Sequence, residues 1–271
     1  MNLRVVGALV VRHLFLYTRS WVRIVELIFW PMMDLLVWGY LTVFLQQTSG
    51  SFQGDTARFK EFIKFLIGAM IFWDVLFRSQ QAVAISFLED IWTKNLLNVF
   101  VAPIRIREFI GATFVVGLIR VVITVLILAV LAQVLYAFNL LTFRLTLLPF
   151  FANLLIFGWA LGMISTALIT RWGQAAEGLA WAVPFLIQPV SAVFYPVSVL
   201  PRWLQPVGLA LPCTHVFEGM REVLASGRVS WEHLAWATGL NALYIIAAAG
   251  FFHFMFVMAR DKGLLTKLGT Q

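Results

Sequence analysis

Charged residues and cysteines are scarce in this sequence. Only 12% of its 271 residues are charged, whereas 61% are hydrophobic, and the mean hydropathy is +0.89. A soluble domain carries about 25% charged residues, so this composition excludes a soluble enzyme or a soluble binding domain. It also excludes a disordered chain, which would be poor in apolar residues. The one cysteine, Cys213, excludes an intrachain disulfide and a cysteine-rich metal site.

Sequence motifs for catalysis are absent as well. The chain contains no Gly-Lys dipeptide, which excludes a Walker A phosphate loop. Its four histidines lack the spacing of zinc ligands, and no serine lies in a Gly-x-Ser-x-Gly turn. The sequence therefore predicts a chain that is not an enzyme and binds no metal or cofactor. If the protein drives an energy-requiring process, the energy would come from a partner or from an ion gradient.

Long apolar runs are what the sequence does contain. A helix that spans a membrane needs about 20 mainly apolar residues. Six runs meet this requirement, and no linker rich in Gly, Ser or Pro separates them into domains. The sequence predicts one all-α integral membrane domain over residues 1–271, with spans at 24–45, 62–87, 109–136, 147–170, 178–195 and 233–258.

Basic residues outnumber acidic ones and give a net charge of +7. In a soluble chain this excess would suggest nucleic acid as a partner. In a membrane chain, Lys and Arg collect in the cytoplasmic loops. More of them fall in the cytoplasmic segments when the N-terminus is placed inside. We therefore expect a multi-pass protein of the cytoplasmic (inner) membrane with both termini cytoplasmic, lipid around it, and no nucleic-acid partner.

The first 23 residues combine a basic stripe with apolar faces. At 100° per residue, Arg4, Arg12, Arg19 and Arg23 share one narrow face. Such a stripe suits a layer of anionic lipid headgroups, so residues 1–23 are predicted to form an interfacial helix. The alternative is a plain basic leader to the first span.

Residues 88–103 form a predicted cytoplasmic loop that is unusually apolar. Trp92, Leu96 and Phe100 fall on one helical side, and Pro103 would end a helix. So many exposed apolar residues need a partner to cover them. This pattern predicts a short amphipathic helix, with a simple extension of the second span as the alternative.

Residues 196–228 are predicted to be re-entrant. Six of the nine prolines lie from Pro184 to Pro212, in a stretch that stays largely apolar. Broken helices persist at membrane depth only where protein or water satisfies the freed backbone groups. We expect short re-entrant helices near the outer face, between the fifth and sixth spans. The alternative is an ordinary extracellular loop.

Four charges fall inside predicted spans, namely Asp34, Asp74, Arg78 and Arg120. Exposed to lipid, each would cost several kcal/mol. Asp74 and Arg78 are four residues apart and can pair on one helix face, while Asp34 and Arg120 are expected at similar depth. The group is either an ion-pair cluster that locks the helices or the lining of a transport path or proton relay.

Aromatic residues are abundant, with 25 Phe, 11 Trp and 5 Tyr. Examples are Trp73 and Phe77 in the second predicted span and Phe185 in the fifth. Their rings could bind a sugar or a flat apolar group. Anchoring and packing are the commoner uses of aromatic residues in membranes.

Two stretches carry a resemblance to a known family. Residues 194–205 read Phe-Tyr-Pro-Val-Ser-Val-Leu-Pro-Arg-Trp-Leu-Gln, and Pro212, Glu218 and Arg221 follow. This resembles the Tyr-Pro…Leu-Pro-x-Trp-Leu stretch of the membrane (permease) subunits of ABC-2-type transporters. The loop that starts at Glu89 resembles the acidic, Leu-rich loop of the same family, although the family's Gly-Thr is replaced by other residues.

The resemblance implies half of a membrane channel, paired with a second copy or a close homologue. Two separate ATP-binding-cassette subunits, which bind ATP and Mg, would drive export of a lipid, a drug-like molecule or a lipid-linked glycan. By this resemblance, the residues that couple the chain to the ATPases would be Glu89, Asp90, Trp92, Lys94, Leu96 and Leu97. The outer gate would comprise Tyr195, Pro196, Pro201, Trp203, Pro212 and Arg221.

Two other classes of function stay open from the residues alone. A secondary carrier or channel would use Asp34, Asp74 and Arg120 to bind or relay ions without ATP. A membrane enzyme that acts on lipids would need an acid–base set, for which His215, Glu218 and Glu222 are the candidates.

Overall fold

The computed structural model describes residues 2–49, 56–93, 102, 104–138 and 146–262, and within these ranges it contains helices and no strand. The elements are α1 (Leu3–Thr18), α2 (Trp21–Ser49), α3 (Thr56–Trp92), α5 (Ile106–Tyr136), α6 (Leu148–Trp172), η2 (Gly173–Ala176), α7 (Glu177–Ile187), η3 (Gln188–Val190), η4 (Val197–Val199), α8 (Gln205–Leu209), α9 (Pro212–Ser226) and α10 (Trp231–Asp261).

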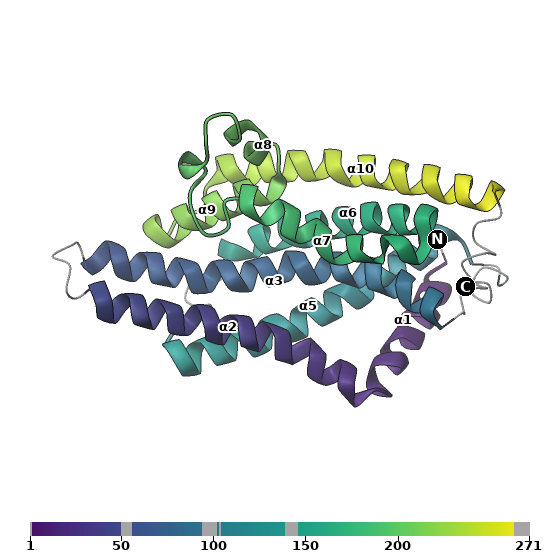
Figure 1. Cartoon of the computed structure of the whole chain (residues 1–271), viewed down its shortest axis with the longest axis horizontal. Coiled ribbons are helices and arrows are strands. Elements are labelled where there is room, and N and C mark those ends of the chain that lie inside the picture. Colours follow the sequence, from purple (N-terminus) through teal and green to yellow (C-terminus); the bar gives the residue numbers. More distant parts are fainter. Residues whose placement is uncertain (1, 50–55, 94–101, 103, 139–145, 263–271) are drawn as a thin grey trace.

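The long helices α2, α3, α5, α6 and α10 run roughly along one axis as a bundle (Figure 1). The short helix α1 is set at an angle to α2 and lies at one end of the bundle. Helix α10 finishes at this same end, whereas α8 and α9 lie toward the other (Figure 1). The start of α1 and the end of α10 are therefore on the same side of the molecule.

Four of the described helices are long and apolar enough to cross a membrane. They are α2 over residues 21–41, α5, α6 and α10, and they coincide with the first, third, fourth and sixth predicted spans. The described residues thus confirm an all-helical fold with four candidate membrane spans. Helix α3, over the second predicted span, has 37 residues but carries Asp74 and Arg78 in its middle and is not among the four.

The predicted span 178–195 is wrong as a single helix. Helix α7 has only 11 residues and ends at Ile187, followed by the short 3₁₀ helix η3 and a turn. At 1.5 Å per residue, α7 is about 16 Å long, which is half of a hydrocarbon core. Pro189 explains this early end, because it removes a backbone donor that a longer helix would need, whereas Pro184 lies within α7.

The second span extends further than predicted. Helix α3 continues through Trp92, so residues 88–92 extend it, and no separate helix begins at residue 88. The remainder of the predicted loop, residues 94–101 and 103, lies outside the described residues. Beyond α7, the predicted re-entrant segment contains the short helices η4, α8 and α9.

Close packing between α3 and α6 forms the centre of the bundle. Gly158 and Gly162, one turn apart on α6, lie against the backbone of α3. A Cβ atom on Gly158 would be 2.7 Å from the carbonyl oxygen of Leu76, and one on Gly162 would be 2.8 Å from that of Gln80. Small residues at this spacing let two membrane helices approach closely. The Gln80 amide also donates to the Ser165 hydroxyl at 3.0 Å.

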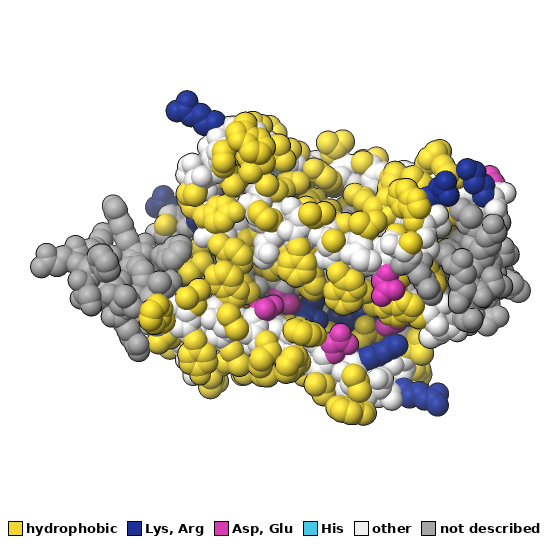
Figure 2. Space-filling view, in the orientation of Figure 1, with side chains coloured by type: hydrophobic (Ala, Val, Ile, Leu, Met, Phe, Trp, Pro, Cys, Tyr) yellow, Lys and Arg dark blue, Asp and Glu magenta, His cyan; other side chains and the backbone are white. Residues whose placement is uncertain are grey.

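The outer surfaces of the bundle are apolar. Figure 2 shows hydrophobic side chains over most of the visible face. Exposed residues of α5 and α10 point away from the core, among them Leu126, Val130, Val134, Leu243, Ile246 and Phe254. Exposure of such an apolar surface to water would be unfavourable, whereas contact with the hydrocarbon of a bilayer is favourable.

Candidate functional site

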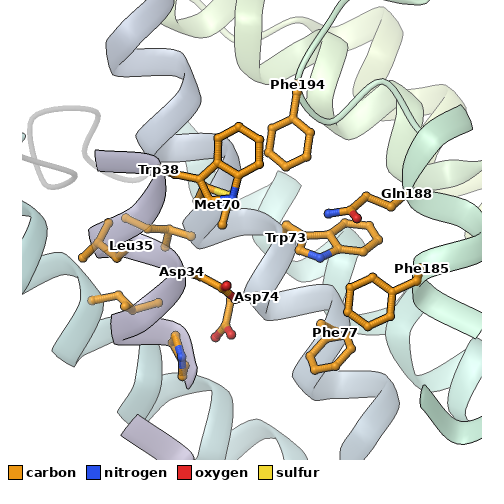
Figure 3. A pocket seen from close by; sticks show the side chains of 13 residues that line it. Asp34, Leu35, Trp38, Met70, Trp73, Asp74, Phe77, Phe185, Gln188 and Phe194 are labelled. Atoms are coloured by element: carbon orange, nitrogen blue, oxygen red, sulfur yellow. The ribbon is translucent and has the colours of Figure 1, made fainter. Parts of the chain in front are cut away.

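An aromatic cavity lies between α2, α3 and the α7–η3 segment. Its volume is about 220 Å³. Five aromatic side chains and two carboxylates line it (Figure 3). The aromatic residues are Trp38, Trp73, Phe77, Phe185 and Phe194, and the carboxylates are those of Asp34 and Asp74; Pro31, Leu35, Met70, Ile71, Leu128 and Gln188 complete the wall.

The charges of this cavity do not balance. Arg78 Nε donates to both carboxylate oxygens of Asp74, at 2.9 and 3.1 Å, which confirms the predicted pair. Asp34 is exposed, and in the described part of the chain no side chain forms an ion pair or hydrogen bond with it. Its nearest charges are those of Arg78 and Asp74.

Arg120 is not opposite Asp34. Its guanidinium carbon lies 3.6 Å from the centre of the Tyr17 ring of α1, and Glu89 is the nearest carboxylate that acts on it. The predicted cluster of four charges is therefore divided between two sites. Depth along a helix can be counted from sequence, but it does not fix the face on which the side chain lies.

A second charged site joins α1 and α2 to the end of α3. Arg12 of α1 pairs with Asp90, with one guanidinium–carboxylate contact at 3.4 Å and a shorter one beside it. Arg23 of α2 pairs with Glu89 at 3.2 Å. Both carboxylates are buried. Two of the four arginines predicted to face lipid headgroups thus contact the chain itself.

The apolar side of α1 packs on the beginning of α5. Val6 and Leu9 are buried with Ala112 of α5. The backbone N–H of Asn2 donates to Glu108 Oε1 at 2.7 Å. Burial lowers the pKa of His13, whose Nδ1–H donates to the carbonyl of Leu9 at 2.8 Å. Helix α1 is therefore held by α5 and by the end of α3, and its contact with the membrane surface stays a prediction.

The Arg12–Asp90 pair is testable by a double-mutant cycle. Arg12→Met and Asp90→Asn, singly and together, should give a coupling energy of about 1–3 kcal/mol in denaturant unfolding, because the carboxylate is buried. The exposed pair Arg260–Asp261 is the matched control and should couple by less than about 1 kcal/mol. Equal coupling in the two cycles would contradict a structural role for Arg12.

Of the remaining predicted coupling residues, only one belongs to the described part of the chain. Trp92 is 43% exposed, and its indole N–H donates to Glu177 of α7 at 3.2 Å. Lys94, Leu96 and Leu97 lie outside the described residues. Glu89 and Asp90 face inward, so Trp92 is the described member of this set that a partner could contact.

Arg221 organises the opposite end of the molecule. From α9 it donates to the backbone carbonyls of Ala192, Val193 and Tyr195, the last at 2.8 Å, and pairs with Glu218 at 3.1 Å. Glu218 in turn accepts the N–H of Val197 at 2.6 Å. This pair therefore fixes the turn after η3 and brings three of the predicted gate residues, Tyr195, Pro196 and Arg221, together.

Other predicted gate residues lie apart from Arg221. Pro201 and Trp203 are exposed, the latter to 75%, and Pro212 occupies the first turn of α9. Glu218 was not predicted for this set. The signal that could have identified it is its position three residues before Arg221 on a helix.

The residues considered for a lipid enzyme are only partly brought together. His215 Nε2 donates to the carbonyl of Leu209 at 2.9 Å, Glu218 is engaged with Arg221, and Glu222 lies 3.7 Å from His233. His215 Nδ1 also lies 3.4 Å from His233 Nδ1, so His233 links His215 to Glu222, whereas Glu218 is held by Arg221. Within the described residues, no group of His, Cys, Asp and Glu could hold a metal ion.

Comparison with known families identifies the chain's relatives. The family model for the ABC-2 type transporter matches residues 4–225. The chain belongs to the ABC-2 type transporter family. The match covers the ABC-2 chain from α1 almost to the end of α9, and so includes both charged sites, the cavity and Arg221. No curated protein sequence matches it at a significant level. The ABC-2 family and the apolar helices together indicate a multi-pass membrane transport component that associates with an ATP-binding subunit.

Proposed function

We propose that this ABC-2 chain is the membrane subunit of an exporter that moves an amphipathic substrate, driven by a separate ATPase. The observation that supports this most is the double ion pair of Arg12–Asp90 and Arg23–Glu89. It ties α1 and α2 to α3 immediately before the loop that an ATPase would contact. A displacement of that loop would therefore be transmitted to α1, α2 and α3 together.

The proposed topology has both termini in the cytoplasm of the inner membrane. Helix α3 would be a further span, and α7 with η3 would enter the membrane without crossing it as one helix. Several basic side chains lie at the end of the bundle where α1 begins and α10 finishes, including Arg4, Arg105, Arg107, Arg171, Arg260 and Lys262. That bias favours this end as the cytoplasmic one.

The proposed assembly has two copies of this chain and two ATP-binding-cassette subunits. The substrate would be a lipid, a drug-like molecule or a lipid-linked glycan, and ATP and Mg would bind only to the partner subunits. Closure of the ATPases on ATP would move residues 88–103, of which 88–92 are the end of α3 and the part after α3 would act as the coupling helix. The segment around Arg221 would close the outer end, and exposed apolar residues of α2, such as Val37 and Phe44, would face the second copy or lipid.

Co-purification tests this proposal. The tagged chain, extracted from its native membrane in mild detergent, should carry a stoichiometric protein with a Gly-Lys-Ser/Thr loop, identified by mass spectrometry. Trp92→Asp combined with Leu96→Asp should remove that protein, because a charge would oppose burial of the apolar side of the loop.

The matched control is Trp203→Asp, which changes a more exposed tryptophan at the opposite end. It should leave the ATPase bound. A preparation of the wild-type chain with no ATPase and no ATP hydrolysis would contradict the proposal.

A secondary carrier is the second candidate, and it is favoured by Asp34, which has no ion-pair partner among the described residues and lies beside the Asp74–Arg78 pair. In that case Asp34→Asn should abolish transport driven by an ion gradient in vesicles. Changes to Trp92 and Leu96 would then have little effect.

A further inference from the structure

We propose that the cavity between α2, α3 and α7 is a binding site for a hydrophobic organic cation with a single positive charge. This inference deepens the proposed function, on which it rests, by naming the chemical class of the transported molecule. Three observations carry it: the charge of the cavity, the arrangement of its aromatic rings and its volume.

Counted by formal charge, the cavity and the adjoining Arg78 have one negative charge in excess. Asp34 and Asp74 contribute two carboxylates, and Arg78 contributes one guanidinium. Arg78 is committed to Asp74, with which it forms two hydrogen bonds. Figure 3 shows Asp34 and Asp74 next to each other, facing the same space. In the described part of the chain Asp34 has no ion-pair partner, and such a carboxylate within a predicted span favours a cation beside it.

The aromatic rings lie on two sides of the carboxylates, above them and to their right in Figure 3, and four of the rings form two pairs. Trp38 stacks on Phe194, with ring centres 4.6 Å apart and planes 16° apart. Phe77 lies against Phe185 at 5.5 Å, and Trp73 lies near this second pair (Figure 3). The negative faces of such rings attract quaternary ammonium groups, and their apolar surface covers the remainder of an organic cation.

The volume and the lining further limit the ligand. A cavity of about 220 Å³ is smaller than a typical site for a drug-sized molecule. It suits a small organic cation or the cationic end of a larger amphiphile. An anion or a phosphate headgroup is disfavoured, because both carboxylates would repel it and the only guanidinium in the group is already paired.

The full chain in lipid nanodiscs, without nucleotide or ATPase, tests this inference. The probe is benzyltrimethylammonium, and its binding is followed by saturation-transfer-difference NMR against empty nanodiscs. We expect saturable binding that neopentylbenzene, the neutral molecule of the same shape, does not reproduce. Asp34→Asn should raise the Kd at least about tenfold, because it removes the excess charge at close range.

Two variants separate loss of charge from loss of structure. Asp34→Glu keeps the charge and should keep the Kd within about threefold of the wild-type value. Asp261→Asn removes an exposed acid at the end of α10 and should leave binding unchanged. Phe185→Leu, at an exposed position of the cavity wall, should weaken binding severalfold.

Several results would overturn the inference. They are no saturable binding by the wild-type chain, equal binding of the neutral molecule, or an unchanged Kd in a folded Asp34→Asn variant. Because no ATPase is present, these results are independent of co-purification. An ATPase that co-purifies with a chain unable to bind the cation would leave the proposed function standing and refute this site.

Discussion

Arg221→Leu is expected to lower the free energy of unfolding by about 3–5 kcal/mol, since it removes one partner of a largely buried ion pair. Glu218 would keep its charge with only the backbone N–H of Val197 beside it. The carbonyls of Val193 and Tyr195 would also lose their donor. Denaturant unfolding in mild detergent measures the effect, and transport should be lost with it.

Two matched variants sharpen the test of Arg221. Arg221→Lys keeps the positive charge but cannot reach several carbonyls and a carboxylate with one ammonium group, so it should recover only part of the stability. Arg202→Leu, at an exposed position of the same end, should change stability by less than about 0.5 kcal/mol. Wild-type stability in Arg221→Leu would show that the turn after η3 is held by other contacts.

The second large effect is expected at the glycines of α6. Gly162→Ala and Gly158→Ala should each destabilise the chain by about 1–3 kcal/mol, because the new methyl groups would push into the backbone of α3. Gly162→Leu should prevent folding, since several more atoms would have to fit in the same contact. Thermal unfolding of the purified chain measures both.

Gly250 of α10 provides the matched control. A Cβ atom there meets nothing within 4 Å, so Gly250→Ala should be neutral or slightly stabilising through its better helix propensity. If Gly162→Ala behaves in the same way, the α3–α6 interface can separate at little cost, and the contact does not fix the bundle.

Local patterns in the sequence were sufficient for part of this structure. The apolar runs predicted four helices that the structure confirms, and the spacing of Asp74 and Arg78 predicted their ion pair. These features depend on residues within one helix. Resemblance in the stretch from Tyr195 to Arg221 indicated the family, which the match over residues 4–225 confirms.

Contacts between distant segments could not be predicted in the same way. Arg12 and Asp90 are 78 residues apart, and nothing in either local pattern selects the other as a partner. The sequence places Arg120 in one cluster with Asp34, Asp74 and Arg78, because the position of α1, with Tyr17, cannot be read from it. The cavity combines Trp38 and Phe194 with Trp73 and Phe185, which come together only through packing.

The place where α6 touches α3 divides that helix into two unequal arms. From the contact at Leu76 and Gln80, α3 continues about 20 residues to Thr56 but only about 12 to Trp92, so the arms are roughly 30 and 18 Å long. If α3 pivoted at the two glycines, a displacement at Trp92 would become one about 1.7 times as large, in the opposite direction, at the far end. Asp74, close to the fulcrum, would hardly move.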